Sequence, residues 1–231
     1  MNILIILSYV ENSNNSFVKE LVKKSEYIIC ADGGQIFAKN HNIYPDLCVG
    51  DFDSTSELNI DNKDTNNIKN YRLFNSEYVT YPSEKNLTDA EASIKEAIDR
   101  FKNKKLDITL LGGIGGRLDH TLGAINTIRK YSSKNIKIRL VDMKNTAEFI
   151  SSKANNTILL PYSKNYKYFS IIPYDEVAIG VTIKGAKYNL DDYDLTRAGT
   201  LGISNEVLDK NDKIATVTIS DGDLLIIRSN D

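Results

Sequence analysis

The sequence predicts an α/β domain with a mostly parallel sheet, followed by a small antiparallel β-sandwich domain. In the first part of the chain, short β-rich runs alternate with segments whose apolar residues recur at helical spacing, which is typical of a parallel sheet covered by helices. After about Val141 the helical pattern ends, and short strand-like runs separated by Gly, Asn and Asp turns follow. We therefore expect an α/β domain over residues 1–143 and a β-sandwich domain over residues 144–231.

The strands expected in the first domain are short and rich in branched residues, and they lie at residues 3–7, 27–31, 47–49, 79–81, 108–111 and 136–141. Two helices are expected between them. One follows Thr88, where the apolar residues from Ala90 to Phe101 form one stripe, and the next runs from Leu118 to Ile128. The second domain is expected to hold strands at residues 157–160, 168–172, 181–184, 215–219 and 224–228. The polar stretch at residues 59–70 indicates an exposed loop or a poorly packed helix.

Composition excludes some classes of protein. The 231 residues carry 29 Lys and Arg against 31 Asp and Glu, a net charge of −2, which argues against a binder of nucleic acid driven by charge. The two cysteines, Cys30 and Cys48, lie in apolar runs and are expected to be reduced core residues. Because no apolar run is long enough to span a bilayer and the N-terminus lacks a basic leader, we expect a cytoplasmic protein.

Four polar segments carry the chemistry of the first domain, at residues 31–34 (ADGG), 50–54 (GDFDS), 87–91 (LTDAE) and 112–120 (GGIGGRLDH). Three of them follow an expected strand directly, and the segment at 87–91 opens a helix a few residues after one. Ligands of open α/β sheets bind outside the carboxyl ends of the strands. The four segments are therefore expected to converge on one crevice.

The GDFDS segment is the most informative. If the strand continues through it, Asp51 and Asp53 project to one face while Phe52 turns toward the core. Two carboxylates about 5 Å apart repel by roughly 3 kcal/mol at an effective dielectric constant near 20. A divalent cation removes that repulsion, and oxygen ligands suit Mg²⁺. The alternative interpretation is a solvated Asp-Ser turn.

The other three segments each have a structural explanation as well. Thr88 and Glu91 fit a capping box, which would hold Asp89 rigidly in the first turn of a helix. The glycine-rich segment at 112–120 does not match the established phosphate-loop motifs, yet it is a strand, a glycine turn and a helix start, which favours an anion. Arg117 there either grips a phosphate or lies on the surface. In ADGG, the glycines also fit a helix start with Asp32 as its N-cap.

Taken in order, these segments resemble the thiamine pyrophosphokinase family. The matching runs are Ala31–Gly34, Pro45–Asp46 with Gly50–Ser54, Thr88–Glu91, Gly115–His120, and Lys184–Tyr188 through Gly202–Glu206. The resemblance covers nearly the whole chain and implies transfer of the pyrophosphoryl group of ATP to the hydroxyethyl group of thiamine, which gives thiamine diphosphate and AMP. It also implies an α/β domain that binds ATP and Mg²⁺, a β-sandwich that binds thiamine, and a homodimer.

The resemblance also implies roles for single residues. The Mg²⁺ and phosphate cluster corresponds to Asp51, Asp53 and Asp89, with Asp32 close by. The residues that contact or position the phosphates correspond to Thr88, Arg117 and Asp119. The pair that contacts the thiamine pyrimidine corresponds to Ser204 and Asn205. One of the aspartates would accept the hydroxyl proton.

This sequence departs from the family pattern in two respects. Many relatives carry an acid at the position of Asn86, so any role of that acid is lost or moved. The chain has no Trp, so an aromatic contact to thiamine must come from Tyr or Phe. Tyr188 and Tyr193 are candidates, although core packing is the role expected of each.

Three other functions remain open at this point, and one of them is an ordinary kinase, which would release ADP. A pyrophosphokinase for another hydroxymethyl heterocycle, such as a pterin, would share the aspartates and differ in the acceptor pocket. A non-catalytic sensor of nucleotide or thiamine diphosphate would be expected to lack one or more acidic ligands, whereas the set in this sequence is complete.

Overall fold

The computed structural model describes residues 1–11, 13–52, 72–82, 86–208 and 214–231. The chain divides into two compact units. The first consists of residues 1–127 and 140–142, and the second of residues 128–139 and 143–231. No helix of the described residues is both long and apolar enough to cross a membrane.

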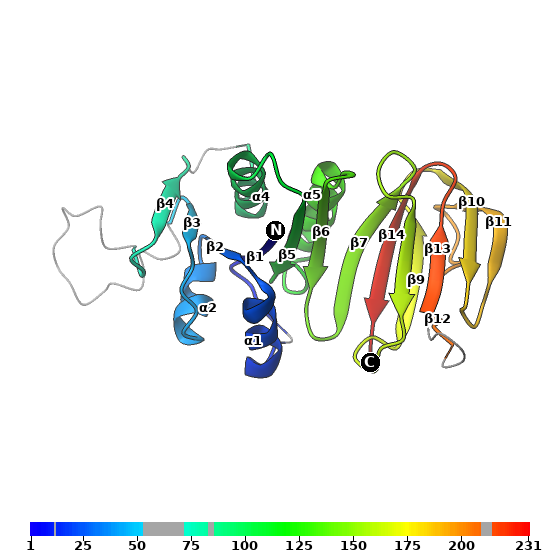
Figure 1. Ribbon diagram of the computed structural model, residues 1–231, viewed down its shortest axis with the longest axis horizontal. Helices are drawn as coiled ribbons and strands as arrows, with labels where there is room; N and C mark the ends of the chain where they lie inside the picture. The colour runs from blue at the N-terminus through cyan, green and yellow to red at the C-terminus, as the bar shows by residue number, and fades with distance from the viewer. Residues whose placement is uncertain (12, 53–71, 83–85, 209–213) are drawn as a thin grey trace. The chain divides into compact units, whose positions relative to one another are not determined.

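The first unit is built on a parallel sheet with the strand order β5-β1-β2-β3-β4. The strands are β1 (Asn2–Ile6), β2 (Tyr27–Ala31), β3 (Leu47–Gly50), β4 (Glu77–Thr80) and β5 (Leu106–Leu111). The helices are α1 (Asn15–Lys24), α2 (Gly34–Asn40), α4 (Asp89–Arg100) and α5 (Leu118–Tyr131). In Figure 1, α1 and α2 lie on one face of this sheet and α4 on the other. The prediction of a mostly parallel sheet covered by helices is confirmed.

Burial on both faces explains why these strands are almost continuously apolar. Four of the five residues of β1 are buried, as are four of the five in β2 and all four in β3. Cys30 and Cys48 are partners in the register of β2 and β3, and both are buried and reduced, as predicted. Burial raises the pKa of each thiol, so neither forms a thiolate readily.

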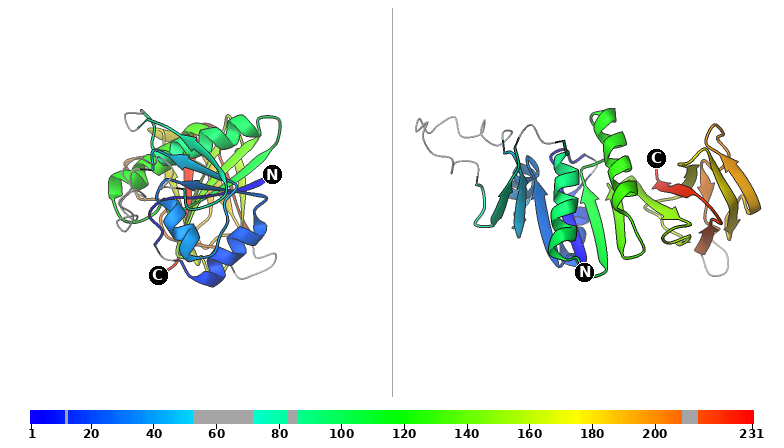
Figure 2. Two further views of the ribbon diagram at one scale, coloured as in Figure 1. Left: turned by 90° about the vertical axis from the view of Figure 1, so that its left-hand side faces the viewer. Right: turned by 90° about the horizontal axis from the view of Figure 1, so that it is seen from above.

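The strands of the second unit form two antiparallel groups, with the orders β12-β9-β14-β7 and β11-β10-β13-β8, and they are drawn in yellow-green to red in Figure 2. Their strands are β7 (Asn145–Ser151), β8 (Thr157–Pro161), β9 (Tyr168–Pro173), β10 (Val177–Lys184), β11 (Leu190–Thr196), β12 (Asn205–Glu206), β13 (Ile214–Thr218) and β14 (Asp223–Ser229). Strand β6 (Ile136–Val141) and helix α5 each contribute residues to both units. Residues of both antiparallel groups, among them Phe169, Leu224, Val181 and Val217, form one hydrophobic cluster.

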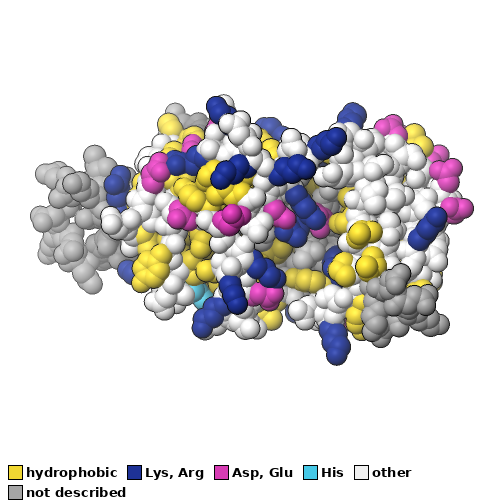
Figure 3. All heavy atoms as spheres, viewed as in Figure 1, with side chains coloured by type: hydrophobic (Ala, Val, Ile, Leu, Met, Phe, Trp, Pro, Cys, Tyr) yellow, Lys and Arg dark blue, Asp and Glu magenta, His cyan; other side chains and the backbone are white. Residues whose placement is uncertain are grey.

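The surface carries charges of both signs. On the face shown in Figure 3, Lys and Arg side chains are interspersed with Asp and Glu side chains. This distribution agrees with the nearly balanced composition of the chain.

Candidate active site

A pocket of about 860 Å³ lies in the first unit, where the strands of the parallel sheet end. It is lined by residues that follow β1, β3 and β5, by the last residue of β2, and by the first turns of α4 and α5. The lining residues are Leu7, Ser8, Tyr9, Ala31, Asp51, Leu87, Thr88, Asp89, Ala90, Gly112, Gly113, Gly115, Gly116, Arg117, Asp119, His120, Gly123 and Ala124. Each of the four polar segments therefore contributes at least one residue to a pocket at the edge where ligands of open α/β sheets bind.

Asp51 reaches the pocket directly after β3 and is half-buried. The backbone of the next residue, Phe52, has a φ of 61°, and its ring is buried against Tyr78, with 5.4 Å between ring centroids. Phe52 thus turns into the core as predicted. The assumed continuation of the strand is wrong, because β3 ends at Gly50 and the left-handed Phe52 redirects the chain. Asp53 lies outside the described residues.

Asp89 is held by the start of α4. Thr88 is the N-cap of this helix, and its hydroxyl accepts a hydrogen bond of 3.2 Å from the backbone N–H of Glu91. The expected cap is therefore present. Because Asp89 is the first residue of the helix, its carboxylate lies at the positive end of the helix dipole and faces the same pocket as Asp51.

The glycine-rich segment after β5 forms another part of the pocket wall. Gly112, Gly115 and Gly116 have φ values of 99°, 100° and 61°, a backbone conformation that side chains disfavour. The turn leads into α5, and its Arg117 forms a bidentate ion pair with Asp119, with N···O distances of 3.1 and 2.6 Å.

This ion pair is exposed at the pocket mouth, with 71% of the Arg117 side chain and 64% of the Asp119 side chain accessible. The guanidinium holds the pKa of Asp119 down at about 2. An incoming phosphate would therefore share Arg117 with Asp119 or displace that carboxylate.

Asp32 follows β2 and is only 4% exposed, but it is not one of the residues that line the pocket. The proposed N-cap role of Asp32 is wrong, because Gly33 occupies the cap position of α2 and no side-chain cap bond forms there. Gly34 allows the close approach of α2 to β1. A β-carbon at this position would lie 2.2 Å from the carbonyl oxygen of Ile6.

The side chains that line the pocket include donors for a divalent metal ion. Asp51 and Asp89 both line it, and carboxylate oxygens are the donors that Mg²⁺ takes from proteins. Among the described residues, no group of three or more His, Cys, Asp or Glu side chains is arranged to hold a metal. One or two carboxylates completed by substrate phosphates and water are the usual Mg²⁺ environment in nucleotide enzymes, so the two aspartates fit the ion.

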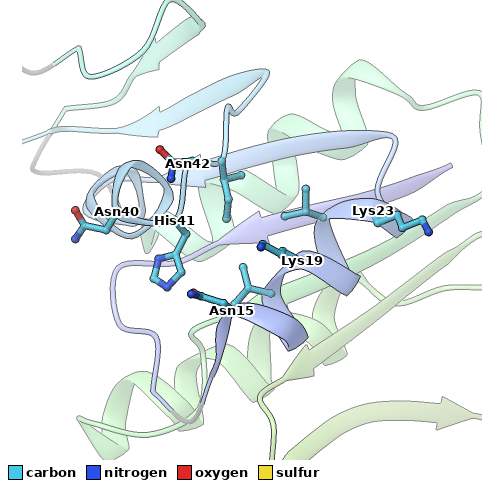
Figure 4. A pocket seen from close by; sticks show the side chains of 9 residues that line it. Asn15, Lys19, Lys23, Asn40, His41 and Asn42 are labelled. Atoms are coloured by element: carbon cyan, nitrogen blue, oxygen red, sulfur yellow. The ribbon is translucent and has the colours of Figure 1, made fainter.

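A second hollow of about 470 Å³ lies between α1 and the end of α2 (Figure 4). Its apolar floor includes Val18 and Ile43, and Lys19, Lys23 and His41 belong to its polar rim. None of the described residues that line it is acidic. It therefore lacks the oxygen donors of a divalent-cation site, and the acidic pocket at the strand ends is the candidate active site.

The pair predicted to meet thiamine lies in the second unit. Asn205 is 2% exposed, and its amide is engaged in local hydrogen bonds. Its Oδ1 accepts from the backbone N–H of Tyr188 at 3.0 Å and from that of Glu206 at 2.9 Å, and its Nδ2 donates to the carbonyl oxygen of Tyr188 at 2.6 Å. Asn205 thus clamps the turn that carries Tyr188. Ser204 beside it is exposed, with a φ of 58°.

The expected packing of Tyr188 and Tyr193 in the core is wrong. Their side chains are 60% and 49% exposed, because each lies on a turn or strand that faces solvent in the second unit. Both rings are therefore accessible to a ligand of this unit.

Five residues that line the active-site pocket lie outside the four predicted segments, namely Leu7, Ser8, Tyr9, Gly123 and Ala124. The first three follow β1, so the rule that ligands bind beyond the strand ends applies to them as well. The signal was the end of the first apolar run, where Ser8 and Tyr9 come directly after a buried strand.

Carboxylates and a glycine-rich strand-turn-helix at the carboxyl edge of a parallel sheet define an enzyme of the class that binds phosphorylated ligands. Comparison with known proteins adds the family. The family model for "Thiamin pyrophosphokinase, catalytic domain" matches residues 18–140, and that for "Thiamin pyrophosphokinase, vitamin B1 binding domain" matches residues 155–222. The chain belongs to the thiamine pyrophosphokinase family.

Individual relatives agree with this assignment. The chain is 32% identical to the thiamine pyrophosphokinase of Bacillus subtilis (strain 168) over 204 residues, which covers 88% of this chain and 87% of the relative. Its structure is similar to the crystal structure of thiamin pyrophosphokinase from Geobacillus thermodenitrificans, with a TM-score of 0.80, 28% identity, and coverage of 100% of this chain and 98% of that one. The crystal structure of the Bacillus subtilis enzyme gives a TM-score of 0.78 at 25% identity, with full coverage of both chains.

Proposed function

We propose that this protein is a thiamine pyrophosphokinase, which transfers the pyrophosphoryl group of ATP to the hydroxyethyl group of thiamine. The observation that carries the proposal is the pocket at the strand ends. It brings Asp51, Asp89 and Arg117 together with a glycine-rich turn, all within the residues that the catalytic-domain family model matches. Phosphoryl-type transfer relies on positioning and charge neutralisation, and this set of residues supplies both.

In the proposed reaction, the hydroxyl oxygen of thiamine bonds to the β-phosphorus of ATP. The bond from that phosphorus to the oxygen bridging the α- and β-phosphates breaks, and AMP leaves with the bridging oxygen. The hydroxyl proton passes to an aspartate of the pocket. Asp53, although outside the described residues, belongs to the proposed acidic set with Asp51 and Asp89, and Asp32 is proposed to support it.

We propose Mg²⁺ as the cofactor, held by Asp51, Asp53 and Asp89. When bound, such an ion neutralises charge on the phosphates and orients them. Thr88 caps α4 and thereby fixes the first turn of the helix, which positions the carboxylate of Asp89. Arg117 is proposed to grip a phosphate, and Asp119 keeps its guanidinium extended over the pocket mouth until the nucleotide arrives.

We propose that the second unit, residues 144–231 in the domain division predicted from the sequence, supplies the thiamine site as a β-sandwich. The match of residues 155–222 to the vitamin B1 binding domain model supports this role. Asn205 would act by holding the turn of Tyr188, and Ser204 and the exposed ring of Tyr188 are available to the acceptor. A homodimer and a cytoplasmic location complete the proposal. No observation favours the pterin pyrophosphokinase or the sensor.

Product analysis tests the function. The purified protein is incubated with thiamine, ATP and Mg²⁺, and the products are separated by chromatography. Thiamine diphosphate and AMP are expected in equal amounts. Formation of ADP, or the absence of turnover in a folded protein, would contradict the proposal. A pterin alcohol in place of thiamine serves as the control for the acceptor and is expected to give no AMP above background.

A further inference from the structure

The segment that follows β1 lies against the glycine-rich turn of the active-site pocket. Tyr9 lines the pocket and is 46% exposed, and its hydroxyl donates a hydrogen bond to the carboxylate of Glu11. Neither residue belongs to the acidic or glycine-rich segments from which the function was proposed. Both residues nevertheless lie next to the glycine-rich segment.

Tyr9 and Glu11 lie close to the three glycines of this turn that have positive φ values. A β-carbon on Gly116 would lie 2.7–2.9 Å from three atoms of the Tyr9 ring, and one on Gly115 would lie 2.5 Å from a carboxylate oxygen of Glu11. At Gly112 it would lie 2.6 Å from the carbonyl oxygen of Tyr9. Real β-carbons do not approach other atoms so closely. The turn is therefore fitted tightly to the residue pair at all three positions.

We propose that Tyr9 is a positioning residue for the nucleotide, which acts by holding the turn at residues 112–117 in the shape that receives phosphate. The inference rests on the proposed function. The Tyr9 ring supplies the surface on which Gly116 rests, and Glu11 fixes that ring through its hydroxyl. Arg117 follows Gly116 directly, so the place where its side chain leaves the backbone is set by the same contact.

The physical reason is conformational entropy. A segment with glycines at 112, 113, 115 and 116 has an unusually large conformational freedom in the absence of contacts, and ordering each residue costs free energy. A turn that is already ordered before the nucleotide arrives avoids this cost at binding. Tyr9 therefore raises the affinity for ATP without touching the acceptor.

Kinetics of three variants test the proposal. In Tyr9→Ala, we expect the KM for ATP to rise about tenfold, while kcat stays within about threefold and the KM for thiamine within about twofold. In Tyr9→Phe, which keeps the ring, all three constants stay within about threefold. The matched control is Tyr44→Ala, because Tyr44 is 77% exposed, lies in the same unit and does not line the pocket. It is expected to behave as the wild type.

Hydrogen exchange provides a readout that does not depend on activity. In the ligand-free protein, amide exchange over residues 112–117 is expected to be at least about tenfold faster in Tyr9→Ala than in the wild type, and within about threefold of the wild type in Tyr9→Phe, which keeps the ring and loses only the hydrogen bond to Glu11. Unchanged exchange and KM in Tyr9→Ala would overturn the positioning role even in an active enzyme. If the wild type forms no AMP while exchange responds as expected, the proposed function fails and the positioning of the turn stands.

Discussion

Replacing Asn205 by Ala is expected to destabilise the second unit strongly. The substitution removes three hydrogen bonds made by a side chain that is 2% exposed, two of them to the backbone of Tyr188. At about 1 kcal/mol for each bond, the free energy of unfolding should fall by about 3 kcal/mol. The Tyr188 N–H and carbonyl and the Glu206 N–H would then have to find water or a new partner.

Urea unfolding followed by circular dichroism measures this loss. With an m value of about 2 kcal/mol per molar urea, the midpoint of the transition should fall by about 1.5 M. The matched control is Ser204→Ala at the neighbouring position, where the side chain is exposed and the change should stay within about 0.5 kcal/mol. If Asn205→Ala unfolds within about 0.5 kcal/mol of the wild type, the clamp on Tyr188 does not exist and the reasoning fails.

Three further predictions concern the first unit. Gly34→Ala should lower the free energy of unfolding by about 1–3 kcal/mol, because the new methyl would lie 2.2 Å from a backbone carbonyl oxygen of β1. The control Gly123→Ala should be neutral or stabilising in a thermal melt, because its methyl meets no described atom within 4 Å. The Asp119 carboxyl should titrate near pH 2 by NMR, because the guanidinium of Arg117 favours its ionised form, and its pKa should return toward about 3.9 in Arg117→Ala. The paired state is thus present above the unfolded pKa and is lost as the pH falls through about 2. An unchanged titration midpoint in Arg117→Ala would exclude the pair. Asp51→Asn should lower turnover at least about a hundredfold with an unchanged melting temperature, and near-normal turnover would remove Asp51 from the acidic set.

Much of the first unit was predictable from the sequence because buried parallel strands are uniformly apolar. The runs that became β1, β2, β3 and β5 needed no tertiary information. Strand β11 was missed for the opposite reason. In its sequence LDDYDLT only Leu195 is buried, so an exposed strand at the edge of its sheet carries no hydrophobic alternation to detect.

The candidate site was predictable in part. The rule that ligands bind beyond the strand ends predicts from the sequence that Asp51, Asp89 and Arg117 lie together, and they line one pocket. This rule does not predict which residues far apart in the chain contact each other. The engagement of Asn205 with Tyr188, 17 residues away, depends on tertiary structure, as does the contact of Tyr9 with a turn more than 100 residues downstream. The chemical roles of these residues stay predictions.

Positional labelling tests most directly whether the β-phosphorus of ATP is the atom attacked. The protein is given thiamine, Mg²⁺ and ATP labelled with ³²P at the β-position, and the label is followed into the thiamine product. We predict that the labelled phosphorus is found in thiamine diphosphate and that the released nucleotide is unlabelled AMP. Label retained in ADP, with only the γ-phosphate transferred, would contradict the account.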